Sequence, residues 1–252
     1  MAKSSIVPGQ APAHHAESTS LVPSDSHVPA IDNRDYDSPS NDRITPFLGI
    51  VSSVGKLAKK FRSDYAKFVY AERLVLGAEV KVIGLRLEKL YVGTKVNGVE
   101  LKFEDKKPTW KTANAAHQAG FAIDFDSNCP NKAEEAANLL LLVSGPKDDP
   151  SGDFFIEIGG DHFAPVQMTV RRGGYRSTYK PLFTQQGNAQ MRGQKLYQTV
   201  WTMSTEEVAS KKNDNVWPEP RIAIKSRLTD EELKKLEEVL PNFISNGMTA
   251  GE

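Results

Sequence analysis

Apolar residues recur every three or four positions between residues 46 and 72, which predicts a long amphipathic helix. Thr45 and Pro46 stand where an N-cap and a first helical residue are expected. The opposite face is basic and carries Lys56, Lys59, Lys60, Arg62 and Lys67. We interpret it first as a solvated face, with a phosphate-tracking face and a membrane-surface helix as alternatives.

The pattern changes to strand-like alternation over residues 78–104, which predicts two or three strands. Asn97-Gly98 lies between two valines, and this pair favours a type I′ hairpin turn because both positions need positive φ. A short helix over about 110–118 is expected to end near Gly120, and residues 121–126 read as a strand.

Further along, residues 130–143 combine an acidic start with a leucine run, and we predict a helix there. Strands are expected at four segments, namely 154–158, 164–170, 170–183 and 194–203. Ser204 and Glu207 fit a capping box for a short helix, and 220–228 predicts a final strand. Thr229 and Glu232 fit the capping box of a C-terminal helix.

These elements predict the α+β class. The expected core is mostly antiparallel β, either an OB-type barrel or a curved sheet, flanked by N-terminal and C-terminal helices. Residues 44–252 are expected to form a single domain. Residues 1–43 are rich in Ser, Pro, Asp and Ala with little periodic apolar content, so we expect a disordered, mildly acidic tail.

The chain's formal net charge of zero hides a segregation along the sequence. Basic blocks occupy residues 56–111 (+7) and 162–205 (+6), and the block between them, 112–161, is acidic (−7). The two ends, 1–43 and 206–252, are each −3. The local charge of each block is therefore a better indication of binding partners than the net charge of the whole chain.

Residues 162–205 carry six cations, six aromatic residues and no carboxylate. Cations neutralise phosphates, and aromatic rings stack on exposed bases, so this composition indicates a nucleic-acid-binding surface that prefers single strands. A second basic and aromatic group at 106–111 could extend it. The candidate contacts are Arg171, Arg172, Tyr175, Arg176, Tyr179, Lys180, Arg192, Lys195, Trp201, Lys106, Lys107, Trp110 and Lys111.

Gly173-Gly174, within this window, would allow a tight turn or a close backbone approach. The competing interpretation is an ordinary basic hairpin, whose aromatic residues are core and whose cations pair with the acidic block. We expect DNA or RNA binding without enzymatic activity, in replication, recombination or transcription, and this hypothesis fits a phage or mobile-element genome.

Two other function classes stay open. One is a structural or assembly protein, such as a virion or scaffold component. The other is a metal-dependent nuclease, in which Asp124 and Asp126 would share a divalent ion with Glu157 or Asp161. Carboxylates are common on polar strand faces, so we expect no metal-binding residues in this chain.

Known cofactor and targeting motifs do not appear in the sequence, so no cofactor is expected. Gly49 to Lys56 approaches the phosphate-loop pattern but has the wrong spacing and lacks the hydroxyl residue after the lysine. We expect a reducing, cytoplasm-like compartment, which for a viral protein is the host cytoplasm. This expectation rests on the single cysteine and on the lack of a membrane-spanning apolar run and of a secretory signal in the sequence. The acidic tail is a candidate for a protein partner, and the oligomeric state is open.

Overall fold

The computed structural model describes residues 45–102, 105–123, 127–209 and 215–241, all within one compact unit, Ser38–Glu252. These residues form mostly antiparallel β-sheet with few helices, which confirms the predicted α+β class. The predicted tail at 1–43 lies outside the described residues, as do residues 124–126 of the predicted strand.

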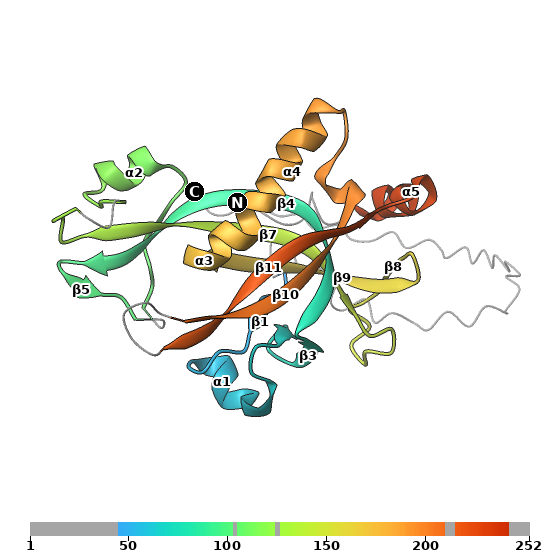
Figure 1. Cartoon of the computed structure of the whole chain (residues 1–252), viewed down its shortest axis with the longest axis horizontal. Helices are drawn as coiled ribbons and strands as arrows, with labels where there is room; N and C mark the ends of the chain where they lie inside the picture. The colour runs from blue at the N-terminus through green and yellow to red at the C-terminus, as the bar shows by residue number, and fades with distance from the viewer. Residues whose placement is uncertain (1–44, 103–104, 124–126, 210–214, 242–252) are drawn as a thin grey trace, which may run out of the picture. The chain divides into compact units, whose positions relative to one another are not determined.

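Within the described part of the chain, eight strands form the main sheet, in the order β11-β10-β4-β7-β9-β8 with β5 and β6 also paired to β4 (Figure 1). Their bounds are β4 Glu79–Val96, β5 Val99–Glu100, β6 Thr109–Trp110, β7 Lys132–Gly145, β8 Ile156–Ile158, β9 Asp161–Arg171, β10 Thr199–Ala209 and β11 Val216–Arg227. All these pairings are antiparallel.

The β4–β5 hairpin forms as the sequence predicts. Its turn residues Asn97 and Gly98 have φ values of 49° and 80°, and Val96 pairs with Val99 on either side. Two positive φ angles are the requirement of the type I′ turn. The expected strand at 220–228 is also present, as β11.

The helix predicted over 130–143 is wrong, because this segment is strand β7. One set of alternate residues, including Leu139 and Leu141, packs in the largest core cluster, and Leu142 packs in a second cluster on the opposite face. A strand buried on both faces reads as a continuous apolar run, and such a run cannot be told from a buried helix by periodicity.

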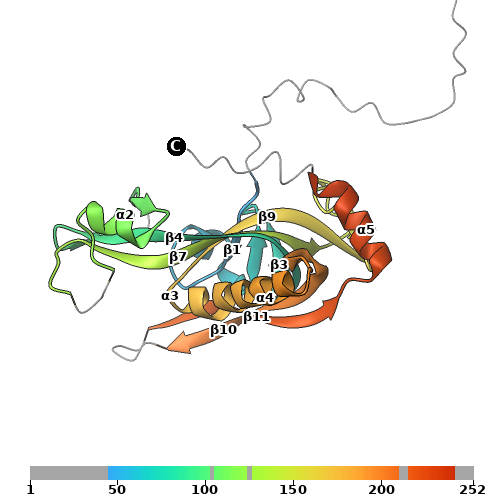
Figure 2. The ribbon, with the colours of Figure 1, turned by 90° about the horizontal axis from the view of Figure 1, so that it is seen from above.

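The strand predicted over 170–183 is also wrong. After β9 the chain turns into α3 (Arg172–Gly174), a π-helical segment (Tyr175–Tyr179) and α4 (Lys180–Met191). Figure 2 shows this helical run lying between β4 and β7 on one side and β10 and β11 on the other. The buried residues Tyr175, Tyr179 and Leu182 recur at helical spacing and join the core that the curved sheet encloses.

The long helix predicted over 46–72 is replaced by a small antiparallel sheet. Strands β1 (Leu48–Ile50), β2 (Phe68–Tyr70) and β3 (Leu74–Gly77) pair in this order, and α1 (Lys56–Lys60) and a 3-10 helix (Arg62–Asp64) lie between β1 and β2. Leu48, Phe68 and Tyr70 are buried in the main core cluster. Burial against the main sheet therefore overrides the local helical pattern.

Helices α2 (Ala113–Gln118) and α5 (Asp230–Val239) agree with the sequence prediction. The capping box of α5 between Thr229 and Glu232 is present, and Leu236 and Leu240 cover the sheet face opposite α4. The helix expected after Ser204 is wrong, because Ser204 to Glu207 pair with β11 inside β10.

No helix in the described ranges is long and apolar enough to cross a membrane.

Candidate functional site

Gly173-Gly174, in the carboxylate-free segment 162–205, allows a close approach within the protein itself. A Cβ at Gly174 would lie 3.2 Å from the Pro220 ring, whereas one at Gly173 would meet only the end of the flexible Glu219 side chain. The Ser177 and Thr178 hydroxyls donate to the Pro220 carbonyl at 2.6 and 2.9 Å. Gly174 thus lets the start of the helical run lie close to Pro220 of β11, which is a structural role.

Three aromatic residues proposed as base-stacking groups are core residues. Tyr175, Tyr179 and Trp201 are only 4, 5 and 3% exposed. The Tyr175 and Tyr179 rings stack on each other at 4.8 Å, and burial raises the pKa of both phenols. Base stacking requires an open ring face. The stacking role assigned to these three residues is therefore wrong, and the interpretation of their aromatic rings as core applies instead.

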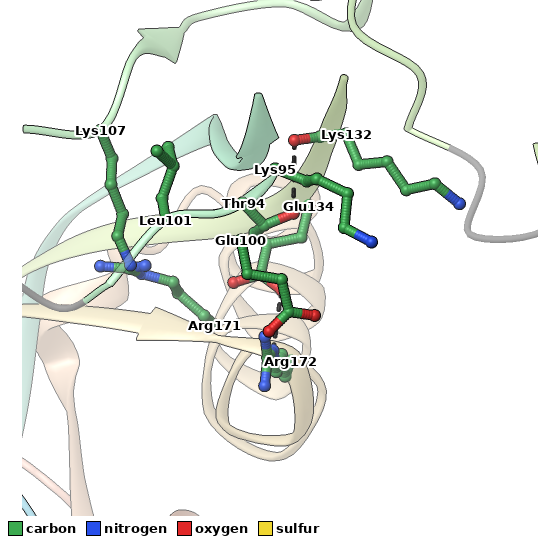
Figure 3. Close-up of a pocket in the computed structure, with 9 residues that line it drawn as sticks. All are labelled: Thr94, Lys95, Glu100, Leu101, Lys107, Lys132, Glu134, Arg171 and Arg172. Carbon is green, nitrogen blue, oxygen red and sulfur yellow. Dashed lines mark hydrogen bonds and ion pairs between the residues drawn. The ribbon is translucent and has the colours of Figure 1, made fainter. Parts of the chain in front are cut away.

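Arg171 and Arg172 lie at a pocket, which we call the basic pocket. It forms where the pairing of β9 with β7 ends and the chain turns into α3. Its volume is about 420 Å³. Figure 3 shows the lining side chains, which come from β4, β5, β7, β9, α3 and the segment before β6. They are Thr94, Lys95, Glu100, Leu101, Lys107, Lys132, Glu134, Arg171 and Arg172.

The basic pocket carries an excess of positive charge. Five lining residues are cationic and two are carboxylates, a formal balance of +3. Lys107 and Arg171 point toward each other in Figure 3. Because the fold holds these like charges close together, the Arg171 guanidinium adds to the effect of burial in lowering the pKa of Lys107. An anion between them would relieve this repulsion.

Arg172 is held at the pocket by a buried carboxylate. Its Nε donates to Glu134 Oε2 at 2.9 Å, and this hydrogen bond raises the pKa of Arg172. The Glu134 side chain is 5% exposed, whereas that of Arg172 is 72% exposed. Arg172 also has a φ of 51°, an uncommon conformation for a residue other than glycine that costs on the order of 1 kcal/mol or more. The ion pair therefore fixes the arginine while leaving much of its guanidinium accessible.

The structure gathers only some of the predicted contacts. Lys107, Arg171 and Arg172 share the basic pocket. Lys106 and Lys111 are exposed near Lys107 in the sequence, on either side of β6. Trp110, in β6, is half-buried with its ring 4.5 Å from that of Phe121.

The other predicted contacts lie along the helical run and beyond it. Arg176 and Lys180 are exposed, in the π-helical segment and at the start of α4. Arg192 is exposed at the end of α4, and Lys195 lines a separate cavity of about 300 Å³. These four residues do not line the basic pocket.

Sequence reasoning missed Lys95 and Lys132 as pocket residues. Lys95 belongs to the basic block at 56–111, so segment charge could have indicated it. Lys132 begins β7 and belongs to the acidic block, where nothing local distinguishes it. Glu134 was assigned to a helix, and only the strand pairing brings it to Arg172.

The metal hypothesis falls largely outside the described residues, because Asp124 and Asp126 are among those whose structure is not described. Among the residues that are described, no group of three or more His, Cys, Asp or Glu side chains could hold a metal ion. Asp161, one of the suggested partners, forms an ion pair with Lys81 at 2.5 Å.

Comparison with known proteins found no matching family model, no similar curated protein and no similar solved structure.

Proposed function

We propose that the protein binds nucleic acid non-enzymatically, with a preference for single strands, and that the basic pocket holds backbone phosphates. The observation that carries this proposal is the balance of five cations against two carboxylates in one cavity of about 420 Å³. Cationic side chains that neutralise phosphates release counterions, and this supplies most sequence-independent affinity. Such binding would serve replication, recombination or transcription.

Lys107, Arg171 and Arg172 are the proposed phosphate ligands. The two arginines present planar donor groups that suit phosphate oxygens, and the lysine adds a compact point charge. Exposed Lys106 and Lys111 would follow the backbone on either side. With Tyr175, Tyr179 and Trp201 buried, the proposal rests on phosphate contacts and not on base stacking.

Two features favour a single strand as the ligand. Reading a duplex usually places a helix or ribbon in the major groove, but the helical run that Arg172 begins packs against β11 and buries Tyr175 and Tyr179 in the core, so it is not free to enter a groove. The pocket's volume lies in the range of small-ligand sites, which suits one nucleotide unit better than a duplex. The proposal needs only a curved sheet, in which the pocket forms where β9 leaves β7, and not an OB-type barrel.

Fluorescence anisotropy with a labelled single-stranded oligonucleotide, at about 50 and about 200 mM salt, tests the proposal. The informative variant is Lys107→Gln combined with Arg171→Gln, because Arg172→Ala would leave buried Glu134 unpaired. Each lost phosphate contact lowers the slope of log affinity against log salt by about 0.7 for a single strand, so the double variant should lose about 1.4.

The matched control is Lys234→Gln combined with Lys235→Gln, which removes the same charge from exposed positions on α5. We expect a much smaller effect from this control. Absence of binding by the wild-type protein at the lower salt concentration, or equal slopes for the two double variants, would refute phosphate binding at the pocket. An unlabelled duplex as competitor measures the preference for single strands.

A further inference from the structure

Five cations between residues 56 and 67 do not form the continuous basic face that the sequence predicts. Lys56 forms an ion pair with Glu72, and Lys67 forms one with Asp64 at 2.9 Å. Lys60 donates to the backbone carbonyl of Glu72 at 2.5 Å. The remaining two are Lys59 and Arg62. Asp64 and Glu72 are therefore already engaged by other lysines.

Lys59 and Arg62 line a second cavity of about 420 Å³, which we call the α1 cavity. Both residues are exposed, and among the described residues neither has a hydrogen-bond or ion-pair partner through its side chain. The lining residues that the structure describes include no carboxylate; they are Ser52, Ser53, Val54, Gly55, Ala58, Lys59, Arg62 and Tyr65. Two cations thus face a hollow whose described lining residues include no counter-charge, with Glu207 acting only from beyond the lining near Tyr65.

The rest of the α1 cavity suits an oxyanion. Ser53 and Tyr65 add hydroxyl donors, while the Ser52 hydroxyl already donates to the Val54 carbonyl at 2.6 Å. The Tyr65 phenol is protonated at neutral pH and can donate, since its ordinary pKa of 10 already lies well above neutrality and is raised further by burial and by Glu207. Gly55 has a φ of 103° and forms the turn that brings Ser53 and Lys59 around one hollow.

We propose that the α1 cavity is a phosphate-binding site, separate from the basic pocket, with Lys59 and Arg62 as its charged ligands. An arginine and a lysine with neighbouring hydroxyl donors, and with no carboxylate among the described lining residues, match the charge and hydrogen-bonding needs of a phosphate group. The phosphate has two chemical sources, a nucleic-acid backbone or a free phosphate compound. The site itself does not depend on the function proposed for the basic pocket.

Amide NMR of the full ¹⁵N-labelled chain during titration with pyrophosphate tests the site. We expect saturable shifts at residues 52–65 in the wild-type protein. In Lys59→Gln combined with Arg62→Gln, the apparent affinity should weaken about tenfold or more, because two charge-assisted contacts are lost. The matched control is Lys56→Gln combined with Lys67→Gln, which removes the same charge from lysines that already have partners. This control should retain the shifts.

The oligonucleotide assay separates the two sources. If the phosphate belongs to nucleic acid, Lys59→Gln with Arg62→Gln lowers the salt slope by about 1.4. If the slope is unchanged while pyrophosphate still shifts residues 52–65, the ligand is a free phosphate compound, and the site stands even where the basic pocket binds no oligonucleotide. No shift at 52–65 together with an unchanged oligonucleotide affinity would overturn the site.

Discussion

Replacing Glu134 by glutamine should strengthen anion binding at the basic pocket. Glu134 is one of two carboxylates that oppose five cations there, so Glu134→Gln raises the formal balance of the lining from +3 to +4. The new amide keeps an oxygen that can accept from Arg172 Nε, at the position of the present 2.9 Å bond. The substitution therefore changes charge more than it changes the position of Arg172.

The size of the effect follows from geometry. A phosphate bound to the outer edge of the Arg172 guanidinium would lie about 7 Å from the Glu134 carboxylate, across the guanidinium and two hydrogen bonds. At that distance the repulsion is about 0.6 kcal/mol in water and about 2.4 kcal/mol at an effective dielectric constant of 20. For an open pocket we expect about 1 kcal/mol, which tightens oligonucleotide binding about fivefold at low salt.

Anisotropy titrations of wild-type protein and Glu134→Gln at low and high salt measure this effect. Because salt screens a repulsion over such a distance, the gain should shrink as ionic strength rises. Glu231→Gln on α5 is the control, since it removes the same charge from an exposed position outside the pocket lining. An affinity for Glu134→Gln that equals or falls below that of the wild type at low salt, with the melting temperature retained, would refute the reasoning.

Three further predictions concern stability. Gly187 is exposed within α4, and among the described residues no atom beyond its chain neighbours and its own helix backbone lies within 4 Å of where its Cβ would stand. Gly187→Ala should therefore stabilise the protein by about 1 kcal/mol and raise the melting temperature by about 2–4 °C; no rise by calorimetry would contradict this. Gly145→Ala should instead destabilise by about 1–3 kcal/mol or more in urea unfolding, because its methyl group would overlap the buried Phe154 ring. Arg73 donates to both oxygens of Asp149 and holds the pKa of that carboxyl well below its ordinary value of 3.8. The ion pair stabilises the fold fully above the ordinary pKa of 3.8, and this stabilisation is lost as the pH falls through the lower folded-state pKa. The melting temperature of the wild type should therefore exceed that of Arg73→Leu by less below about pH 4 than at neutral pH. A difference that grows on acidification would be inconsistent with the pair.

Several elements could be predicted from sequence because short-range physics determines them. The turn at Asn97-Gly98 needs two positive φ angles, and few residue pairs other than this one tolerate them. The α5 helix begins at a capping box whose two hydrogen bonds join residues only three positions apart, Thr229 and Glu232. In both cases the determining interactions lie within a few residues of one another.

Part of the candidate site could likewise be predicted from the sequence, and part depends on long-range packing. Composition alone indicated Arg171 and Arg172, since both lie in a long window without carboxylates. It could not tell which aromatic residues of that window face solvent. Tyr175 and Trp201 are buried because the helical run lies inside the curved sheet, and that arrangement depends on strands far apart in the sequence.

The sequence by itself determined the α+β class, the mostly antiparallel core, the β4–β5 turn, the C-terminal helix and the concentration of cations in two blocks. Only the tertiary structure decided that 132–145 is a strand, that 172–191 is helical, and that Lys107 meets Arg171. The physical reason is burial. Long-range packing stabilises any local conformation that buries apolar area in the core. The free energy gained from this burial exceeds the small differences in intrinsic propensity between helix and strand.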